Sequence, residues 1–300
     1  MRVFINGFGR IGRALVRAWA LQGMPFEIAA INSRWSLDVD FRLLKWDSVH
    51  DTFEVEKADG ALVVNGVKIP HWRKDAEAME WPGLLVEASG AYRRAPEKLK
   101  AKRVLFTAPA KAEVTIIPGI NDNALADQRF ISMGSCTTNC LAHLIQPFVE
   151  NILWMEAITV HAVTNDQRIL DGGHRDPRRA RSLFNIIPTS SGASVALGEV
   201  FPALRGRVMA MRVPVPDGSA VMAALWLNED INDPLKHYVE NRYVRISRAP
   251  MVSSDVVGDS HSCIVDAGFT DGGNPIRLMG WYDNEWGYAN RLLELIKVIV

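Results

Sequence analysis

Cysteine is scarce in this 300-residue sequence, which contains only three, an odd number. Two of them, Cys136 and Cys140, stand four positions apart, which is one turn of a helix. Small secreted domains that depend on disulfides have many cysteines, usually an even number. The cysteine content therefore excludes a disulfide scaffold and leads us to expect a protein of the reducing cytoplasm.

The sequence also lacks long apolar runs and an excess of charge of either sign. The longest uninterrupted apolar stretch that we find is residues 220–227, whereas a membrane span needs about 20 residues. An apolar run begins at Val3 and leads straight into a glycine motif, so we expect no secretory leader. Lys and Arg number 34, as do Asp and Glu, so no overall charge favours nucleic acid or an anionic membrane. We expect no membrane and no specific nucleic acid as a partner, although local charged patches remain open.

The composition that remains is 48% hydrophobic and 23% charged, which is typical of a soluble globular protein and argues against disorder. The length fits two domains of ordinary size. In the first 135 residues, short apolar runs alternate with helical spacing, and Ile11, Leu15 and Ala18 predict a helix over residues 10–21. The apolar runs are residues 3–6, 27–32, 84–87, 104–107, 114–117 and 130–132. This alternation predicts an α/β domain with a doubly wound parallel sheet, the Rossmann type.

The pattern changes in the second half of the chain, where strand-like runs are longer and fewer helices separate them. These runs are residues 158–163, 208–214, 221–227, 263–269 and 275–281. They predict an α+β domain with a mixed or antiparallel sheet. In the last segment, residues 285–300, we expect a helix that docks by an apolar stripe. The stripe consists of Ala289, Leu292, Leu293, Ile296 and Ile299.

Residues 6–12 read Asn-Gly-Phe-Gly-Arg-Ile-Gly and contain the pattern G-x-G-x-x-G between a predicted strand and a predicted helix. Gly7 allows the tight turn, Gly9 lets a pyrophosphate approach the backbone, and Gly12 lets helix and strand pack closely. The free N–H groups of the helix N-terminus then face the phosphates. We expect a dinucleotide site; the alternative is a glycine-rich turn without a ligand.

The end of the second predicted strand indicates which dinucleotide binds. An acidic residue about 20 positions after the motif ordinarily accepts a hydrogen bond from the ribose 2′-hydroxyl. Here Ser33 has no charge to repel a 2′-phosphate, and Arg34 can pair with one. These residues favour NADP, or tolerance of both NADP and NAD. In the alternative, Arg34 points to solvent and Asp38 or Asp40 binds the ribose.

Cys136 lies in the stretch Ser-Cys-Thr-Thr-Asn-Cys of residues 135–140, between a predicted strand and an apolar helix. At a helix N-terminus, the dipole and the free N–H groups lower the pKa of a thiol and stabilise a developing oxyanion. We therefore expect Cys136 to be a nucleophile. Cys140, one turn deeper, is expected to be a small buried apolar residue.

A nucleophilic thiol needs a base, and His161 is the candidate. It lies at the end of a predicted strand, which can return it to Cys136. The other six histidines stand in weaker contexts. No set of His, Cys and Asp has the spacing of metal ligands, so we expect no metal.

With these motifs the sequence resembles the glyceraldehyde-3-phosphate dehydrogenase family. The similarity spans the whole chain, and the matching stretches taken together are specific to this family. The matching stretches are residues 5–13 (INGFGRIGR), 107–111 (TAPAK), 135–140 (SCTTNC), 161–171 (HAVTNDQRILD), 175–182 (RDPRRARS), 185–193 (NIIPTSSGA), 211–217 (MRVPVPD) and 281–291 (WYDNEWGYANR). The resemblance implies a Rossmann domain for NAD(P) of residues 1–134 and 285–300, a catalytic domain of residues 135–284, and a homotetramer.

The resemblance also implies roles for individual residues. Cys136 is similar to the family's nucleophile and His161 to its base. The pocket for the substrate's own phosphate corresponds to Thr164, Asp166 and Arg212. The pocket for inorganic phosphate corresponds to Ser135, Thr137, Arg179, Ser191 and Gly192. The positions similar to cofactor-binding residues are Asn6, Gly7, Gly9, Arg10, Ile11, Gly12, Ser33, Arg34, Arg73, Ser89, Gly90, Thr107, Asn284 and Tyr288, of which Asn284 would orient the nicotinamide amide.

The implied reaction begins when the Cys136 thiolate attacks the aldehyde carbon and His161 manages the hydroxyl proton. A hydride then passes to the nicotinamide and leaves a thioester, which inorganic phosphate attacks to release an acyl phosphate. Arginine and hydroxyl groups suit two phosphate sites, and residues 175–181 hold four arginines. The resemblance implies that this segment lines the site and packs across a subunit interface; the alternative is a solvated basic loop.

The sequence departs from the family in ways that affect these expectations. Members that prefer NAD usually have Asp at the position of Ser33 and often Leu-Pro at the position of Gly172 and Gly173, so both departures support NADP. The chain is also shorter than typical members, before Lys102, around residues 232–243 and at the C-terminus. The first two places are helices in relatives, so we expect effects on stability or assembly. The chain also has Met133 and Gly134 where the family usually has Asn and Ala, and Asp217 where Asn is common.

Three functions compete on this sequence. The first is a phosphorylating glyceraldehyde-3-phosphate dehydrogenase of glycolysis, or one adapted to NADPH and gluconeogenesis. The second is erythrose-4-phosphate dehydrogenase, a relative that hydrolyses its thioester and tends to lose the phosphate cradle that residues 189–192 keep here. The third is a non-catalytic nucleotide-binding paralogue. The presence of Cys136, His161 and the arginines argues against it. We favour the first.

Overall fold

The computed structural model describes all 300 residues, which form two compact units. One unit comprises Met1–Gly134 together with Ala289–Val300, and the other comprises Ser135–Tyr288. Residues 285–288, which the sequence led us to place with the first domain, lie in the second unit. The Asp283 carboxylate holds their start there, because it accepts hydrogen bonds from the backbone N–H groups of Glu285 and Trp286. No helix has both the length and the apolar character needed to cross a membrane.

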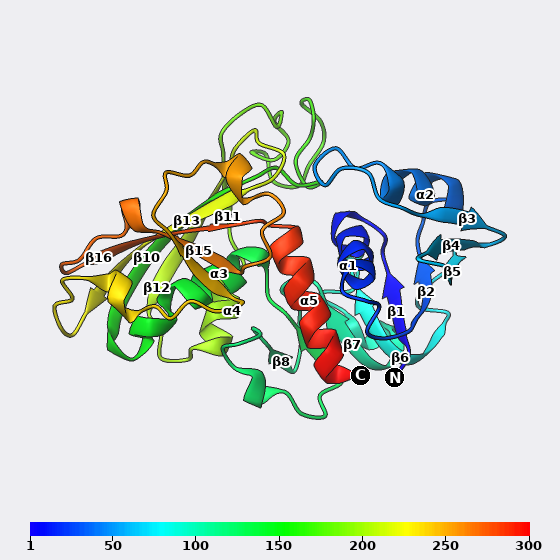
Figure 1. Cartoon of the computed structure of the whole chain (residues 1–300), viewed down its shortest axis with the longest axis horizontal. Coiled ribbons are helices and arrows are strands. Elements are labelled where there is room, and N and C mark those ends of the chain that lie inside the picture. Colours follow the sequence, from blue (N-terminus) through cyan, green and yellow to red (C-terminus); the bar gives the residue numbers. More distant parts are fainter. The chain divides into compact units, whose positions relative to one another are not determined.

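The first unit is built on a nine-stranded sheet (Figure 1). Its strands are β1 (Val3–Asn6), β2 (Ile28–Asn32), β3 (Glu56–Ala58), β4 (Ala61–Val64), β5 (Val67–Trp72), β6 (Glu80–Glu87), β7 (Lys100–Phe106), β8 (Val114–Thr115) and β9 (Phe130–Ser132). Their order is β3-β4-β5-β2-β1-β6-β7-β9-β8. All pairs from β5 to β8 are parallel, which confirms the doubly wound sheet. The order reverses at β1, which has β2 on one side and β6 on the other.

The antiparallel meander of β3, β4 and β5 was not predicted from the sequence. Its two turns are Asp59-Gly60 and Asn65-Gly66, and three of these four residues, Gly60, Asn65 and Gly66, have positive φ angles. Such Asp-Gly and Asn-Gly pairs are strong hairpin signals, because the turn needs positive φ angles. The signal for this meander was therefore present in the sequence.

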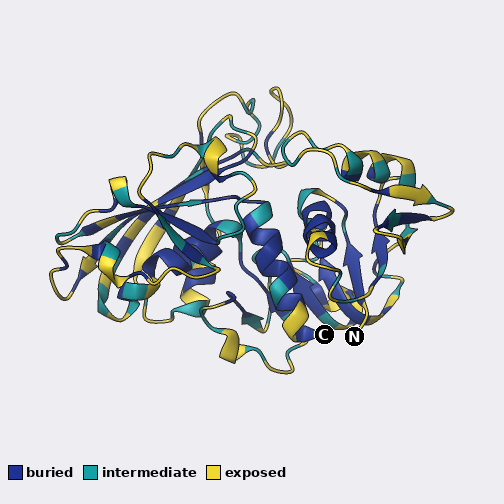
Figure 2. Cartoon of the chain, viewed as in Figure 1, coloured by how far each residue is buried: buried dark blue, intermediate teal, exposed yellow.

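Two helices precede β3 in the first unit. Helix α1 (Arg10–Leu21) is buried from Gly12 to Ala20, as the dark ribbon of Figure 2 shows. Helix α2 (Leu37–Lys45), which we did not predict, begins after Ser36. The Ser36 hydroxyl accepts a hydrogen bond from the backbone N–H of Val39, and this cap sets the start of the helix.

The second unit contains a seven-stranded mixed sheet, as expected from its longer strand-like runs. Its strands are β10 (Ile152–His161), β11 (Ile187–Ser190), β12 (Gly206–Arg212), β13 (Ser219–Leu227), β14 (Val244–Ser247), β15 (Cys263–Asp266) and β16 (Ile276–Tyr282). Their order is β11-β12-β10-β13-β16-β15-β14. The pairs β10–β12 and β14–β15 are parallel, and the others are antiparallel.

Three more helices are α3 (Cys136–Ile145), α4 (Ala193–Val200) and α5 (Trp286–Ile299). Helix α3 packs on β13, β15 and β16. The five residues of the expected apolar stripe in α5 are at most 6% exposed, which confirms that the helix docks by that face.

Short 3-10 helices are η1 (Pro96–Lys98), η2 (Asp122–Ala124), η3 (Gln146–Asn151), η4 (Pro234–His237), η5 (Ser253–Val256) and η6 (Ala267–Phe269). Single turns, η1 and η4, occupy the two internal places where the sequence is short relative to the family. The strand expected over residues 263–269 ends at Asp266, because the Asp266 carboxylate accepts a hydrogen bond from Gly268 N–H and starts η6.

Candidate active site

Cys136 is the first residue of α3, where a capping box sets the start of the helix. The Ser135 hydroxyl oxygen accepts a hydrogen bond from Thr138 N–H at 3.1 Å, and Ser135 N–H donates to the Thr138 hydroxyl at 3.2 Å. Ser135 is thus occupied in capping. The cap places the Cys136 side chain at the helix N-terminus, as the sequence predicted.

His161, the last residue of β10, faces this thiol. Its Nε2 lies 3.4 Å from the Sγ of Cys136, and its Nδ1 lies 2.8 Å from the carbonyl oxygen of Ala162. Because a carbonyl oxygen only accepts, Nδ1 carries the proton of the neutral ring. Nε2 therefore presents a lone pair to the thiol, which is the arrangement of a nucleophile with its base.

Burial sets the protonation states of this pair. It raises the pKa of the Cys136 thiol to about 11, against the charge of Arg212 and hydrogen bonds involving Thr137, which lower it. Burial also lowers the pKa of His161 to about 3, and the charge of Arg212 adds to this effect. The expectation of a low thiol pKa at the helix N-terminus is not met, because desolvation outweighs the favourable contacts. At neutral pH the pair is a thiol and an uncharged imidazole.

Arg212 reaches the same place through strand register. It ends β12, which pairs in parallel with β10 so that Arg212 lies opposite His161. Its Nη1 donates to the carbonyl oxygen of Ala162 at 3.3 Å, while its buried Nε has no hydrogen-bond partner. The guanidinium charge therefore lies beside the thiol, with its Nε donor unpaired.

Tyr282, at the end of β16, was not predicted as a site residue from the sequence. Its hydroxyl lies 2.9 Å from the Thr137 hydroxyl and 2.8 Å from the Thr159 hydroxyl, and its ring packs edge-on against His161. The side chain is 1% exposed. Thr137, expected at a phosphate, thus has its hydroxyl engaged by Tyr282. No local pattern marks such a residue, because its contacts come from α3 and β10.

Residues expected in two separate phosphate pockets lie together. Arg179 Nη1 donates to the Asp166 carboxylate at 2.5 Å, and Arg179 Nε donates to the Thr189 hydroxyl at 2.9 Å. His174 Nε2 lies 3.3 Å from the same carboxylate. Burial raises the pKa of Asp166, but the charge of Arg179 and hydrogen bonds from His174 and Arg179 outweigh it and leave that pKa lowered. Asp166 is therefore an anion that holds Arg179.

The other expected phosphate residues lie on loops and at a helix start. Thr164 is exposed, and its backbone N–H and its hydroxyl both donate to the amide oxygen of Gln167. Gly192 precedes the first turn of α4, and the Ser191 hydroxyl accepts a hydrogen bond from Ala193 N–H. A helix start of this kind offers backbone N–H groups to an anion.

The glycine motif of the first unit has the geometry that a dinucleotide needs. A Cβ at Gly7, where φ is +101°, would lie 2.4 Å from the backbone nitrogen of Ser89. A Cβ at Gly12 would lie 2.4 Å from the carbonyl oxygen of Gly7. A Cβ at Gly9 would meet nothing within 4 Å. The first and third glycines thus close the turn, and the second leaves the start of α1 open.

Glu87, which we did not predict, organises the neighbouring strand ends. This buried carboxylate accepts hydrogen bonds from Ser89 N–H at 2.9 Å, from Gly90 N–H at 3.0 Å, from the Ser89 hydroxyl and from the Asn6 amide. Thr107 N–H donates to the Glu87 backbone oxygen at 3.2 Å. Four expected cofactor residues are therefore gathered around Glu87, three of them bonded to its carboxylate.

The ends of β2 and β5 carry the residues that bear on cofactor choice. Ser33 N–H donates to the Trp72 carbonyl oxygen, so Ser33 and Arg73 follow paired parallel strands. Arg34 is exposed, and its guanidinium lies 5.3 Å from the ring centre of Trp35.

The acidic alternatives to Ser33 face elsewhere. Asp40 is completely buried and lies 2.8 Å from Nε2 of His71, and Asp38 pairs with Lys57. Asp40 is therefore inaccessible to a ribose, which counts against the alternative that it binds one.

The remaining expected cofactor residues are also placed. The Arg10 guanidinium pairs with Asp47 at the start of α1, and Ile11 is half-buried in the first turn. In the second unit, Asn284 is 5% exposed, and its side-chain oxygen accepts a hydrogen bond from the Ser219 hydroxyl at 2.6 Å. Tyr288 is 4% exposed in α5.

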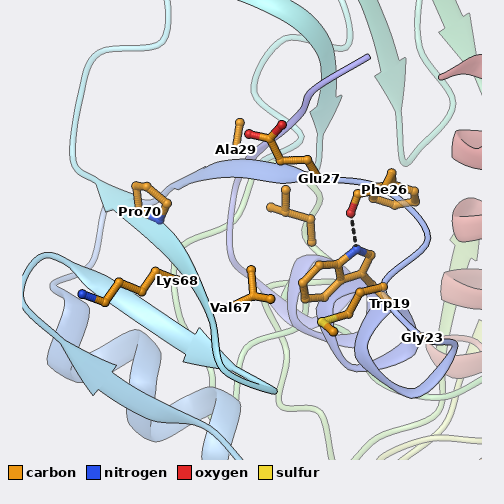
Figure 3. A pocket seen from close by; sticks show the side chains of 10 residues that line it. Trp19, Gly23, Phe26, Glu27, Ala29, Val67, Lys68 and Pro70 are labelled. Atoms are coloured by element: carbon orange, nitrogen blue, oxygen red, sulfur yellow. Dashed lines mark hydrogen bonds between the residues drawn. The ribbon is translucent and has the colours of Figure 1, made fainter.

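A pocket of about 510 Å³ in the first unit contains none of the expected site residues (Figure 3). It lies beside the end of α1, the start of β2 and strand β5, where the Trp19 indole N–H donates to the Phe26 carbonyl oxygen. Dinucleotides bind at the carboxyl ends of parallel strands. This pocket is at the opposite end of β2, so we assign it no part in the reaction.

Comparison with known proteins agrees with this geometry. The glyceraldehyde 3-phosphate dehydrogenase NAD binding domain matches residues 1–95, and the C-terminal domain of the same enzyme matches residues 135–284. Glyceraldehyde-3-phosphate dehydrogenase 2 of Streptomyces avermitilis is 39% identical over 98% of this chain and 97% of its own length. Glyceraldehyde-3-phosphate dehydrogenase of Mycolicibacterium smegmatis is 38% identical over 100% of this chain and 98% of its own length. The chain therefore belongs to the glyceraldehyde-3-phosphate dehydrogenase family.

Proposed function

We propose that this protein oxidises glyceraldehyde 3-phosphate with NAD(P) and inorganic phosphate to an acyl phosphate. The observation that carries the proposal is the 3.4 Å approach of the His161 lone pair to the Cys136 thiol, beside the charge of Arg212. The names of the relatives indicate glyceraldehyde 3-phosphate as the aldehyde substrate, and the paired thiol and base can attack its carbonyl carbon.

The chain's own residues perform the covalent steps. His161 Nε2 accepts the Cys136 proton as the sulfur attacks the aldehyde carbon, so no free thiolate is needed beforehand. The start of α3 stabilises the oxyanion that forms. Bound NAD(P) supplies the hydride acceptor, and Asn284, fixed by Ser219, is our candidate to orient its amide. After oxidation, phosphate attacks the Cys136 thioester and regenerates the thiol.

Two cations serve the two phosphate groups in this proposal. Arg212 has an unused buried Nε, and Arg179 is held in place by Asp166 and Thr189. The start of α4 at Ser191 and Gly192 adds backbone donors near the end of β11. We assign Asp166 to positioning Arg179, because a carboxylate repels a phosphate.

The turn around Gly9 fits a dinucleotide pyrophosphate, because it leaves the start of α1 open. We propose that NADP is preferred. Arg34 and Arg73 follow neighbouring parallel strands, while Ser33 brings no negative charge and Asp40 is buried against His71. Two arginines beside an uncharged serine favour a 2′-phosphate.

We also propose a homotetramer in the cytoplasm. The outward face of the second sheet exposes large apolar side chains, including Met209 at 58%, Met222 at 46% and Trp226 at 36%. Exposed apolar areas of this kind mark interfaces. The three cysteines are all free thiols, which suits a reducing compartment. Light scattering on a sizing column measures the assembly.

The decisive experiment follows reduced cofactor in a spectrophotometer with glyceraldehyde 3-phosphate, using NAD or NADP, each with and without phosphate. We expect turnover that requires phosphate and is faster with NADP, and none from Cys136→Ser. Turnover that ignores phosphate would indicate a hydrolytic enzyme, to be assayed with erythrose 4-phosphate. A folded protein without turnover would contradict the proposal.

A further inference from the structure

Two thiols lie side by side in the second unit. Cys140 on α3 and Cys263 at the start of β15 are both 0% exposed. A Cβ at Gly280 of β16 would lie 2.8 Å from the Sγ of Cys263 and 3.2 Å from the Sγ of Cys140. The absence of a side chain at Gly280 thus leaves one space that both sulfur atoms occupy. Helix α3 and strand β15 are in contact there, which brings the two thiols to the same place.

The third thiol is one helical turn away. Cys136 precedes Cys140 by four residues on α3, is only partly buried, and has His161 beside it as a base. Residues four apart on a helix have Cβ atoms about 5–6 Å apart, whereas a disulfide needs about 3.5–4.5 Å. A bond between Cys136 and Cys140 would therefore strain the helix start and be open to attack by another thiol.

We propose that Cys140 and Cys263 are a resolving dithiol that removes an oxidation from Cys136. The proposal rests on the role of Cys136 as the reactive thiol. Its entry point is the partly buried thiol of Cys136, and its end is a fully buried disulfide that ties α3 to β15. At the end of this series of reactions Cys136 is again a free thiol, so the active site survives one oxidation event.

Each step balances with a peroxide as the oxidant. Cys136 gives its proton to His161 and attacks hydrogen peroxide, which breaks the O–O bond and yields a sulfenic acid and water. The Cys140 thiol displaces the hydroxyl of that sulfenic acid, forms the Cys136–Cys140 disulfide and releases water. The Cys263 thiol then attacks the Cys140 sulfur, and Cys136 departs and takes up a proton. In total, two thiols and one peroxide give one disulfide and two waters.

The test titrates the whole protein with hydrogen peroxide, blocks free thiols under denaturing conditions, and maps disulfides by mass spectrometry. We expect the wild type to form the Cys140–Cys263 disulfide and to keep Cys136 free until about one equivalent per chain has reacted. Cys263→Ser, which nearly preserves the side-chain volume, should lose free Cys136 from the first addition. Alkylation by iodoacetamide measures the loss of free Cys136 even if the protein oxidises no aldehyde. The dithiol proposal and the proposed function can therefore be refuted independently.

Cys136→Ser provides the second variant, since it removes the entry point and leaves the dithiol. We expect its Cys140–Cys263 disulfide to form several times more slowly than in the wild type. An equal rate would overturn the relay, because the buried pair would then be oxidised directly. The proposal is equally overturned if the wild type and Cys263→Ser lose Cys136 along the same titration curve.

Discussion

The Cys136 thiol faces the unprotonated nitrogen of His161, with 3.4 Å between Sγ and Nε2. The Ala162 carbonyl oxygen fixes this orientation, because it accepts from the other ring nitrogen. Both residues are uncharged at neutral pH, since burial raises the pKa of the thiol and lowers that of the imidazole. The thiol therefore depends on proton transfer to His161 during attack.

Replacing this base should slow the chemical step while the thiol remains. We expect His161→Asn to lower kcat by about 10²–10⁴-fold, the usual contribution of a general base. Steady-state assays with saturating aldehyde and cofactor measure the change, with Cys136→Ser as the inactive reference. A kcat within a few-fold of the wild type would show that another group takes the proton.

Arg212 should tune the thiol through its charge. Reactive thiolate increases as pH rises towards the Cys136 pKa of about 11, and the cation lowers that pKa. Arg212→Gln should therefore raise the pKa further and move the pH profile of iodoacetamide alkylation to higher pH. Arg207→Gln, on the exposed part of the same strand, serves as the control and should leave the profile unchanged. Coincident profiles for Arg212→Gln and the wild type would contradict this account.

Two glycines of one motif should respond differently to the same substitution. In Gly7→Ala, the new methyl group would meet the Ser89 backbone at 2.4 Å with a φ of +101°, so we expect a large fall in melting temperature or no folded protein. In Gly9→Ala the methyl group meets nothing, so the melting temperature should stay near that of the wild type. The KM for the cofactor should rise, because the methyl group lies where the pyrophosphate approaches. An unchanged cofactor KM in Gly9→Ala would show that the pyrophosphate does not bind beside Gly9.

The Tyr282 hydroxyl should contribute to stability. Tyr282→Phe leaves the buried hydroxyls of Thr137 and Thr159 without this partner, so the free energy of unfolding should fall by about 1–3 kcal/mol. Urea denaturation measures the change, and Tyr92→Phe at a half-buried position is the matched control. Equal stability of the two variants would mean that the threonine hydroxyls find other partners.

Asp166 should act through Arg179. Asp166→Asn removes the charge that holds this guanidinium at 2.5 Å, so we expect the KM for inorganic phosphate to rise several-fold while kcat changes less. Initial rates at varied phosphate separate the two effects. Asp171→Asn is the control, because its carboxylate pairs with Arg181 on the exposed surface of the same segment. A loss of kcat with unchanged KM would place Asp166 at the reacting atoms instead.

Local patterns in the sequence predicted the parts of the site that depend on backbone geometry. The glycine turn, the start of α3 at Cys136 and the strand end at His161 each follow from neighbouring residues. The pKa of Cys136 did not follow, because desolvation depends on packing from distant segments. Tyr282 was missed for the same reason, whereas Glu87 was missed although three of its four hydrogen bonds come from nearby Ser89 and Gly90. The β3–β5 meander was missed although its turn pairs, Asp59-Gly60 and Asn65-Gly66, are in the sequence.

The parallel pairing of β10 with β12 has a consequence for which changes the protein tolerates. Arg212 lies beside the site because it is opposite His161 in this register. A shift of β12 by one residue would put Met211 there and turn the guanidinium to the other face of the sheet. The charge at the thiol therefore withstands insertions in the long segment between the two strands. It does not withstand the gain or loss of one residue within β12.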